Sequence, residues 1–340
     1  GGSDRVTDIM RLLQINDIHL SDQPPAMRTA SYTDDVLDKV HAAMLIASEQ
    51  RVDVVVFTGD VFHRKNAAHT THRTVQQLRG ILLDFGIPVR IVPGNHDEAH
   101  GGGLEGQPLL SLPGDEVQLL YGDDPDWPIC GIPWNNRMEG SGGAEYIPGK
   151  INACRAPLVF THAPLTVHPW PFGSEARGWV EIAALTPLLR DSVRLVAHGH
   201  MHNGHDCGFD RQPRVPWVMY SNPGALARAT IGHDDAGREP MVALINYDAR
   251  GAEHVAVEYH AVPHRPAAEV YRVAERAADV ARASGIAALS AALTGASTHV
   301  VTPESLVLLL RGLARPDGIA DDVWEQGVAL AERSIEEAGA

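Results

Sequence analysis

The stretch Val52-Asp-Val-Val-Val-Phe-Thr-Gly-Asp60 carries most of the information about the fold. Its first six residues are an almost unbroken apolar, largely β-branched run, which is typical of a strand covered on both faces. Gly59-Asp60 follows at once, so an acidic side chain is placed where the strand ends. Strand ends are where α/β folds place reactive groups, because the backbone is rigid there. We therefore expect functional groups at the ends of buried strands.

The segments on either side alternate between strand and helix patterns. Helical periodicity is expected over residues 33–50 and 69–85, and this order favours a layered α/β architecture. The predicted strands are 10–16, 52–57, 89–92, 117–121, 129–132, 158–160, 193–197, 216–220, 241–247 and 254–259. The last three suggest an antiparallel or mixed second sheet. Residues 139–149 are rich in Gly and are expected to form a surface loop.

The composition limits the class of protein. The chain has 340 residues and a net charge of −15, which argues against a broadly basic nucleic-acid coat. No apolar run approaches the roughly 20 residues that cross a membrane, so no membrane partner is expected. The three cysteines, Cys130, Cys154 and Cys207, form no CxxC pair. We expect free thiols and a cytoplasmic location.

Residues with metal-binding side chains gather in five short motifs, each after a predicted strand. The motifs are Asp17-Ile-His19, Gly59-Asp60, Gly94-Asn-His-Asp97, His162 and Gly199-His-Met-His202. An isolated Asp-x-His is more often a surface or capping pair, and Gly-Asp after a strand is a common turn. Their joint occurrence in this order outweighs these ordinary explanations.

These residue types suit a pair of divalent cations. Two ions about 3.5–4 Å apart need a shared ligand, and a carboxylate such as Asp60 can bridge them. Imidazole and carboxylate ligands suit Mn, Fe or Zn. The amide oxygen of Asn95 limits the negative charge of the site. His96 follows Asn95 and is expected to assist the leaving oxygen rather than bind metal, with Asp97 as the residue that orients it.

The histidine-rich segment Ala197-His-Gly-His-Met-His202 allows two registers. The ligand pair is either His198 with His200 or His200 with His202, and a spacing of i, i+2 puts both side chains on one side of an extended segment. The pattern Gly-His-x-His of this chemistry selects His200 and His202. His198 is then expected to be a packed histidine behind the site.

With these motifs, the chain resembles the calcineurin-like metallophosphoesterase superfamily over residues 10–262. The resemblance implies a four-layer β-sandwich flanked by helices, with an in-line attack on phosphorus by a metal-bridging hydroxide. The implied ligands of the first ion are Asp17, His19, Asp60 and His202. The implied ligands of the second ion are Asp60, Asn95, His162 and His200. Mn is the favoured ion, with Mg, Fe and Zn as alternatives.

Two further motifs are similar to those of SbcD-type nucleases, which process DNA ends with an SMC-like ATPase. They are Gly59-Asp-Val-Phe-His63 and Pro223-Gly-Ala-Leu-Ala-Arg228. The resemblance implies that His63 lies beside the metals and takes part in catalysis. It also implies DNA, an SMC-like (SbcC-like) ATPase and a second copy of the chain, as a homodimer, as partners. Arg64, Lys65 and Arg228 are the candidate substrate-binding residues.

The expected domains are a tag and N-terminal extension at 1–9, a catalytic domain at 10–262 and a smaller, mostly helical domain at 263–340. The last resembles a DNA-capping domain at its start, but its seven Arg and eleven acidic residues also suit a partner-docking element. A DNA exonuclease, with endonuclease activity as an option, is the leading hypothesis. The alternatives are a small-molecule phosphodiesterase or phosphatase, such as one for cyclic nucleotides, and a non-enzymatic scaffold. Trp134 and Trp170-Pro-Phe172 are candidates for stacking a base, although packing is the stronger expectation.

Overall fold

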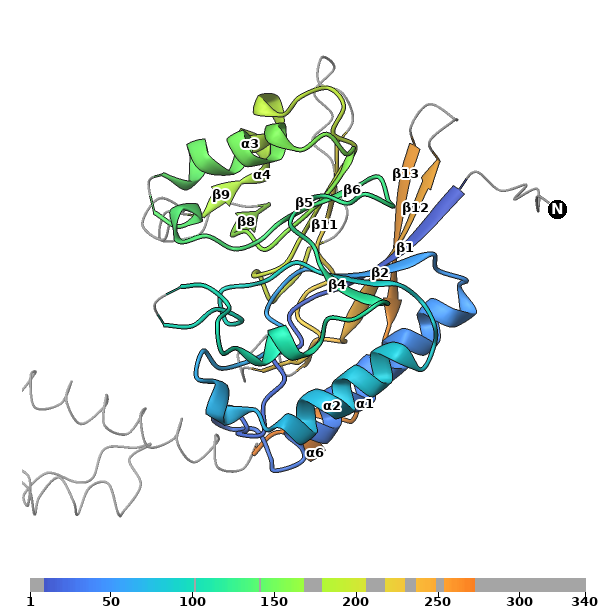
Figure 1. Cartoon of the computed structure of the whole chain (residues 1–340), viewed down its shortest axis with the longest axis vertical. Coiled ribbons are helices and arrows are strands. Elements are labelled where there is room, and N and C mark those ends of the chain that lie inside the picture. Colours follow the sequence, from blue (N-terminus) through green and yellow to red (C-terminus); the bar gives the residue numbers. More distant parts are fainter. Residues whose placement is uncertain are drawn as a thin grey trace, which may run out of the picture. The chain divides into compact units, whose positions relative to one another are not determined.

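The computed structural model describes residues 9–100, 102–140, 142–167, 179–205, 218–229, 237–248 and 254–272 (Figure 1). The chain divides into two compact units, 1–271 and 272–340. The expected boundary at residues 262 and 263 and the expected helical C-terminal domain stay predictions, because residues 273–340 lie outside the described ranges. Cys207, Trp170 and Phe172 also lie outside them.

The first sheet has six strands in the order β13-β12-β1-β2-β3-β4. Strands β1 to β4 run parallel, while β12 pairs antiparallel with β1 and β13 pairs antiparallel with β12. The strand bounds are Ile9–Ile15 for β1, Val54–Phe57 for β2, Val89–Ile91 for β3, Val117–Leu119 for β4, Met241–Asp248 for β12 and His254–Ala261 for β13.

The second sheet has five strands in the order β11-β10-β7-β6-β5. All its pairs are parallel except β5 with β6 at one edge. The bounds are Gly122–Asp123 for β5, Ile129–Ile132 for β6, Leu158–Thr161 for β7, Leu195–His198 for β10 and Met219–Ser221 for β11. A small parallel pair joins β8 (Leu165–Thr166) to β9 (Val180–Glu181).

Strand β2 explains how the layers are held together. Val54 and Val56 belong to the apolar cluster between the two sheets, with Leu158 and Phe160 of β7. Val55 and Phe57 point the other way and pack with the helices that cover the first sheet. Successive side chains of a strand alternate between its faces, so a strand buried on both sides is apolar throughout.

Helices cover the outer face of each sheet (Figure 1). The helices α1 (Tyr32–Glu49) and α2 (His72–Leu83) share a core with the first sheet, and α3 (Gly143–Ala153) and α4 (Ile182–Leu185) share one with the second. This confirms the predicted four-layer α/β sandwich. The shorter helices are η1 (Ala67–His69), η2 (Pro108–Ser111), η3 (Asn136–Met138), η5 (Thr186–Leu188) and α6 (Ala267–Val270).

Three local predictions are wrong. The strands expected at 216–220, 241–247 and 254–259 do not share a sheet, because β11 joins the second sheet while β12 and β13 extend the first. Part of the surface loop expected at 139–149 is helix α3. Ile147 and Ile151 of this helix are buried in the second core, and their burial stabilises a helix despite the internal Pro148.

The third correction concerns the thiols. Cys130 of β6 and Cys154 at the end of α3 form a disulfide, although neither lies in a CxxC motif. The residues are 24 positions apart in the chain, so only the packing of α3 on the sheet brings them together. Disulfides are rare in a reducing compartment, so these two cysteines do not support the expected cytoplasmic location. No helix in the described ranges is long and apolar enough to cross a bilayer.

Candidate metal centre

The predicted ligands converge because the central strands of each sheet run parallel to one another. Their strands β1, β2, β3, β7 and β10 all end at the same edge of the sandwich, and each is followed by a ligand-type side chain. The residues in question are Asp17 and His19 after β1, Asp60 after β2, Asn95 after β3, His162 after β7, and His200 and His202 after β10.

The backbone is unusual at several of these positions. Asp17, His19, Asp60 and His200 have positive φ angles of 48°, 45°, 50° and 72°. Such conformations cost about 1–3 kcal/mol each and persist only where the surroundings enforce them. Here the His19 N–H donates to the Asp60 carbonyl at 2.9 Å, and the His200 N–H donates to the Asp17 carboxylate at 3.1 Å. The loops therefore hold one another in place.

Glycines allow the loops to approach so closely. A Cβ on Gly59, whose φ is +96°, would run into the ring of His162. A Cβ on Gly94 would run into the main chain and carboxylate of Asp60. The glycines of the Gly-Asp and Gly-Asn-His-Asp motifs thus leave the room that the site requires.

The first group of side chains contains Asp17, His19, Asp60 and His202. Their potential ligand atoms all lie within 4.8 Å of one another. The Nε2 atoms of His19 and His202 are 3.0 Å apart, and His19 Nε2 is 3.7 Å from Asp60 Oδ2. This is the set expected for the first ion.

The second group contains Asp60, Asn95, His162 and His200. His162 Nε2 lies 3.0 Å from Asn95 Oδ1 and 3.4 Å from Asp60 Oδ2. His200 Nδ1 lies 3.2 Å from the same Asn95 oxygen. Asp60 Oδ2 therefore faces His162 of this group and His19 of the first, which is the geometry of a bridging carboxylate.

The protonation of these side chains fits cation binding. Burial lowers the pKa of His19 well below its usual value and, with the charge of His162 adding to it, lowers that of His200 to about 3. Burial raises the pKa of Asp60, but His162 and His19 outweigh this effect and lower it well below the usual range. The neutral imidazoles of His19 and His200 converge here with the Asp60 carboxylate and the Asn95 amide oxygen, and His162 joins them once it releases its proton, which gives a donor set for two divalent cations. Buried carboxylates also call for such compensating charge.

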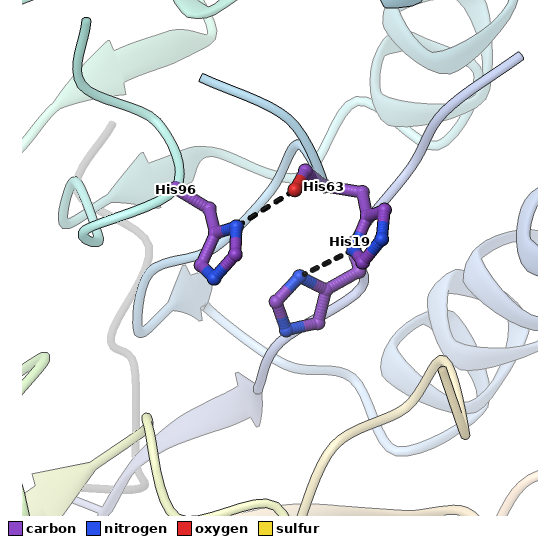
Figure 2. A group of neighbouring side chains, drawn as sticks. All are labelled: His19, His63 and His96. Atoms are coloured by element: carbon purple, nitrogen blue, oxygen red, sulfur yellow. Dashed lines mark hydrogen bonds between the residues drawn. The ribbon is translucent and has the colours of Figure 1, made fainter. Parts of the chain in front are cut away.

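A third cluster joins His63, His96 and His19 (Figure 2). His63 Nδ1 is 3.4 Å from His19 Nδ1, and the rings of His63 and His96 are parallel with centroids 5.8 Å apart. The His96 N–H donates to Asp60 Oδ1 at 2.8 Å, so His96 is tied to the bridging carboxylate through its main chain. Burial and then the charge of Arg64 lower the pKa of His63 to about 4.

Asp97 contacts main-chain groups of two loops. Its carboxylate accepts the N–H groups of Gly94 at 2.8 Å, Phe62 at 2.9 Å and Val61 at 3.3 Å. It therefore joins the two loops that follow β2 and β3. The ring of His96 donates from Nδ1 to the carbonyl oxygen of His63, and the expected orientation of His96 by Asp97 stays a prediction.

The three candidate substrate residues separate into two environments. Arg64 is exposed and Lys65 is half-buried directly after His63. Arg228 is 1% exposed, and its guanidinium donates to the carbonyl of Arg265 at 2.8 Å. We therefore do not retain Arg228 as a substrate contact. His198 is buried and lies 2.8 Å from His205 between their Nε2 atoms, behind the site as expected.

Two supporting contacts have no clear sequence signal. The hydroxyl of Tyr32, the first residue of α1, donates to the carbonyl of His19 at 2.7 Å. The ring of Trp134 stacks on that of His200, with centroids 5.1 Å apart and planes 21° apart. Trp134 is 7% exposed, so it packs into the molecule and supports a candidate ligand at the same time.

The chain is similar in sequence to known phosphoesterases. A model of the family described as calcineurin-like phosphoesterase matches residues 10–204, more than half of the chain. The double-strand break repair protein mre-11 of Caenorhabditis elegans is 28% identical over 140 residues, which cover 32% of this chain and 19% of that protein. The chain thus matches about a fifth of the length of this relative.

Two solved structures share a similar chain course over about three quarters of this chain. A dimetal phosphatase from Danio rerio is 14% identical with a TM-score of 0.42, covering 73% of this chain and 98% of its own. The purple acid phosphatase PPD1 of yellow lupin is 13% identical with a TM-score of 0.44, covering 75% of this chain and 53% of its own.

Proposed function

Since the chain belongs to the calcineurin-like phosphoesterase family, we propose that it is a two-metal-dependent DNA nuclease. In this proposal it acts as an exonuclease, with endonuclease activity as an option, in the processing of DNA ends. The family supports a hydrolase that cleaves phosphoesters. The family does not specify the substrate, so DNA as the substrate is part of the proposal.

The position of His63 carries this choice. Seven other side chains already fill the two ligand groups, so the pair of ions does not require His63. Yet its ring lies 3.4 Å from His19 and is parallel to that of His96 (Figure 2). The pKa of His63 is lowered to about 4, so its ring is neutral and would act on a neighbouring phosphodiester as a hydrogen-bonding group. The similarity to mre-11, whose name refers to double-strand breaks in DNA, supports the same choice.

The proposed ligands are those that the two groups bring together. They are Asp17, His19, Asp60, Asn95, His162, His200 and His202. The ions, with Mn favoured and Mg, Fe or Zn as alternatives, would when bound lower the pKa of water and neutralise phosphate charge. His96 donates from Nδ1 to the His63 carbonyl, so Nε2 is the nitrogen that would give a proton to the leaving oxygen when the ring is in its imidazolium form.

Local positive charge completes the proposed substrate site. Arg64 and Lys65 follow His63 and provide two cations for the phosphate backbone, although the chain as a whole carries a net charge of −15. DNA, an SMC-like ATPase and a second copy of the chain are the proposed partners, and the cytoplasm is the proposed location.

A small-molecule phosphodiesterase or phosphatase is the alternative, and two observations favour it. The net charge of −15 repels a long polyanion, and Arg228 is buried rather than exposed to DNA. Neither observation affects the ions or the histidines, so both activities share one centre.

One experiment separates these functions. Purified protein with Mn is incubated with end-labelled linear DNA and, separately, with bis-p-nitrophenyl phosphate. Asp60→Asn is the matched control, because it removes the bridging charge with little change in size. Metal-dependent cleavage of both substrates, lost in Asp60→Asn, supports the nuclease. Cleavage of the dye without DNA favours the alternative, and cleavage of neither rejects both for this chain.

A further inference from the structure

A cavity of about 400 Å³ lies at the edge of the second sheet. It is open to solvent on one side and lined by strands β5 and β6, by the segment that follows β6 and by helix α3. Its volume lies in the range of sites for small organic ligands, which is about 300–1,000 Å³. No part of the proposed catalytic machinery accounts for it.

Two of its walls connect it to the metal centre. Trp134 lines the cavity and stacks on His200, and its N–H donates to the carbonyl of Pro93 at 2.9 Å, directly before the Gly-Asn-His-Asp motif. Tyr121 lines another wall and follows Leu120, whose N–H donates to the carbonyl of Ile91 at 2.8 Å. The cavity therefore adjoins the strand end that carries Asn95 and His96.

The lining combines aromatic rings with hydrogen-bond donors. Tyr121, Trp134 and Tyr146 supply the rings, and Tyr121 is 53% exposed. Asn135 uses its carbonyl oxygen to accept the N–H of Arg137, so its amide NH₂ remains to donate. Lys150 lies 5.4 Å from the ring of Tyr146 and adds a cationic donor.

The acidic side chain of the lining, Asp123, already accepts hydrogen bonds from main-chain N–H groups. Asp123 accepts the N–H of Arg155 at 2.8 Å and that of Ala156 at 2.9 Å. The cavity thus offers the exposed ring of Tyr121 and the donors of Asn135 and Lys150, while the charged carboxylate of Asp123 is partly satisfied by two main-chain N–H groups. A nucleobase has this complementary form, since it is planar and carries carbonyl and ring-nitrogen acceptors along its edge.

We propose that this cavity is a nucleobase subsite, which holds a base next to the phosphodiester bond at the metal centre. The substrate is then a nucleotide ester, and the protein binds base and phosphate at adjoining places. This inference rests on the proposed function, because hydrolysis at the metal centre supplies the reason for a base to lie there.

Binding of a base is tested apart from hydrolysis with thymidine, which has no phosphate for the metals. Saturation transfer from the full chain to thymidine protons is measured by NMR as thymidine is titrated. Tyr121→Ala and Lys150→Ala are the test variants. Leu188→Ala is the control, because Leu188 is 54% exposed, as Tyr121 is, and does not line the cavity.

The parent and Leu188→Ala are expected to bind thymidine, and Tyr121→Ala is expected to weaken binding about tenfold. Absence of saturation transfer to thymidine in the parent overturns the subsite. It is also overturned if Tyr121→Ala and Lys150→Ala bind thymidine as tightly as the Leu188→Ala control does.

A second measurement separates this inference from the proposed function. The p-nitrophenyl esters of thymidine 5′-phosphate and of methyl phosphate share a leaving group but differ in the base. Tyr121→Ala should lower kcat/KM for the thymidine ester about tenfold more than for the methyl ester. Equal losses overturn the subsite while hydrolysis stands. Binding of thymidine without cleavage of either ester rejects the proposed function while the subsite stands.

Discussion

The carbonyl oxygen of His63 accepts a hydrogen bond from Nδ1 of His96 at 2.7 Å (Figure 2). The main chain of one histidine thus orients the ring of the other. A substitution at position 63 removes the His63 ring but keeps the carbonyl oxygen that orients His96. The two imidazoles can therefore be tested separately.

Replacing His96 by Ala should abolish turnover without loss of metal. His96 lies beside the proposed ligands and contributes only its main chain to Asp60. A lost proton-transfer group lowers kcat by about 10²–10⁴-fold. Metal content per chain, measured by mass spectrometry alongside kcat, should match that of the parent. A loss of metal would mean that His96 is itself a ligand.

Replacing His63 by Ala should reduce DNA cleavage at least about 10²-fold, because the second imidazole beside the phosphate is lost. The orientation of His96 should persist through the carbonyl at position 63. His72→Ala is the matched control, since His72 is exposed at the start of α2. Rates of DNA cleavage are compared for the three proteins, and an unchanged rate in His63→Ala rejects the nuclease assignment of this residue.

The affinity for metal should rise with pH up to about 9. Burial lowers the pKa of His162, but Asp60 and Asp17 more than offset this and raise it to about 9 in the metal-free protein. His162 is then protonated at neutral pH and must release its proton to bind a cation. The dissociation constant for Mn should fall about tenfold per pH unit between pH 7 and 9. A constant that does not change over this range contradicts the account of His162.

Replacing Tyr32 by Phe should lower the free energy of unfolding by about 1–3 kcal/mol. The change leaves the carbonyl of His19 without the hydroxyl that donates to it, in a place where Tyr32 is fully buried. Tyr146→Phe is the control, because its hydroxyl makes no hydrogen bond in the part of the chain that the structure describes. Urea unfolding of metal-free protein measures both, and equal stability of the two variants contradicts the role of Tyr32.

The sequence predicts the ligand types and the layers because both depend on short-range patterns. An apolar run such as that of β2 identifies a strand, and the motif after it places Asp60 at the strand end. The packing of the two sheets then brings Asp60 after β2 and His162 after β7 together, although they are far apart in the chain. The local pattern Gly-His-x-His likewise separated His200 from His198.

Contacts between distant segments lie beyond such patterns. Arg228 is conspicuous in the sequence, but it is buried next to Arg28, which donates to the carbonyl of Arg228 and to the carboxylate of Asp35 at 2.6 Å each. The pairing of Cys130 with Cys154 likewise follows from the position of α3. These arrangements depend on tertiary packing, which residue spacing does not encode.

The central claim is a pair of cations that share Asp60. Anomalous scattering from crystals grown with Mn tests it most directly, because it locates each ion independently of activity. Two peaks are expected about 3.5–4 Å apart with Asp60 between them, and His96 should not be a ligand of either ion. A single peak, or two peaks of which only one contacts Asp60, would contradict it.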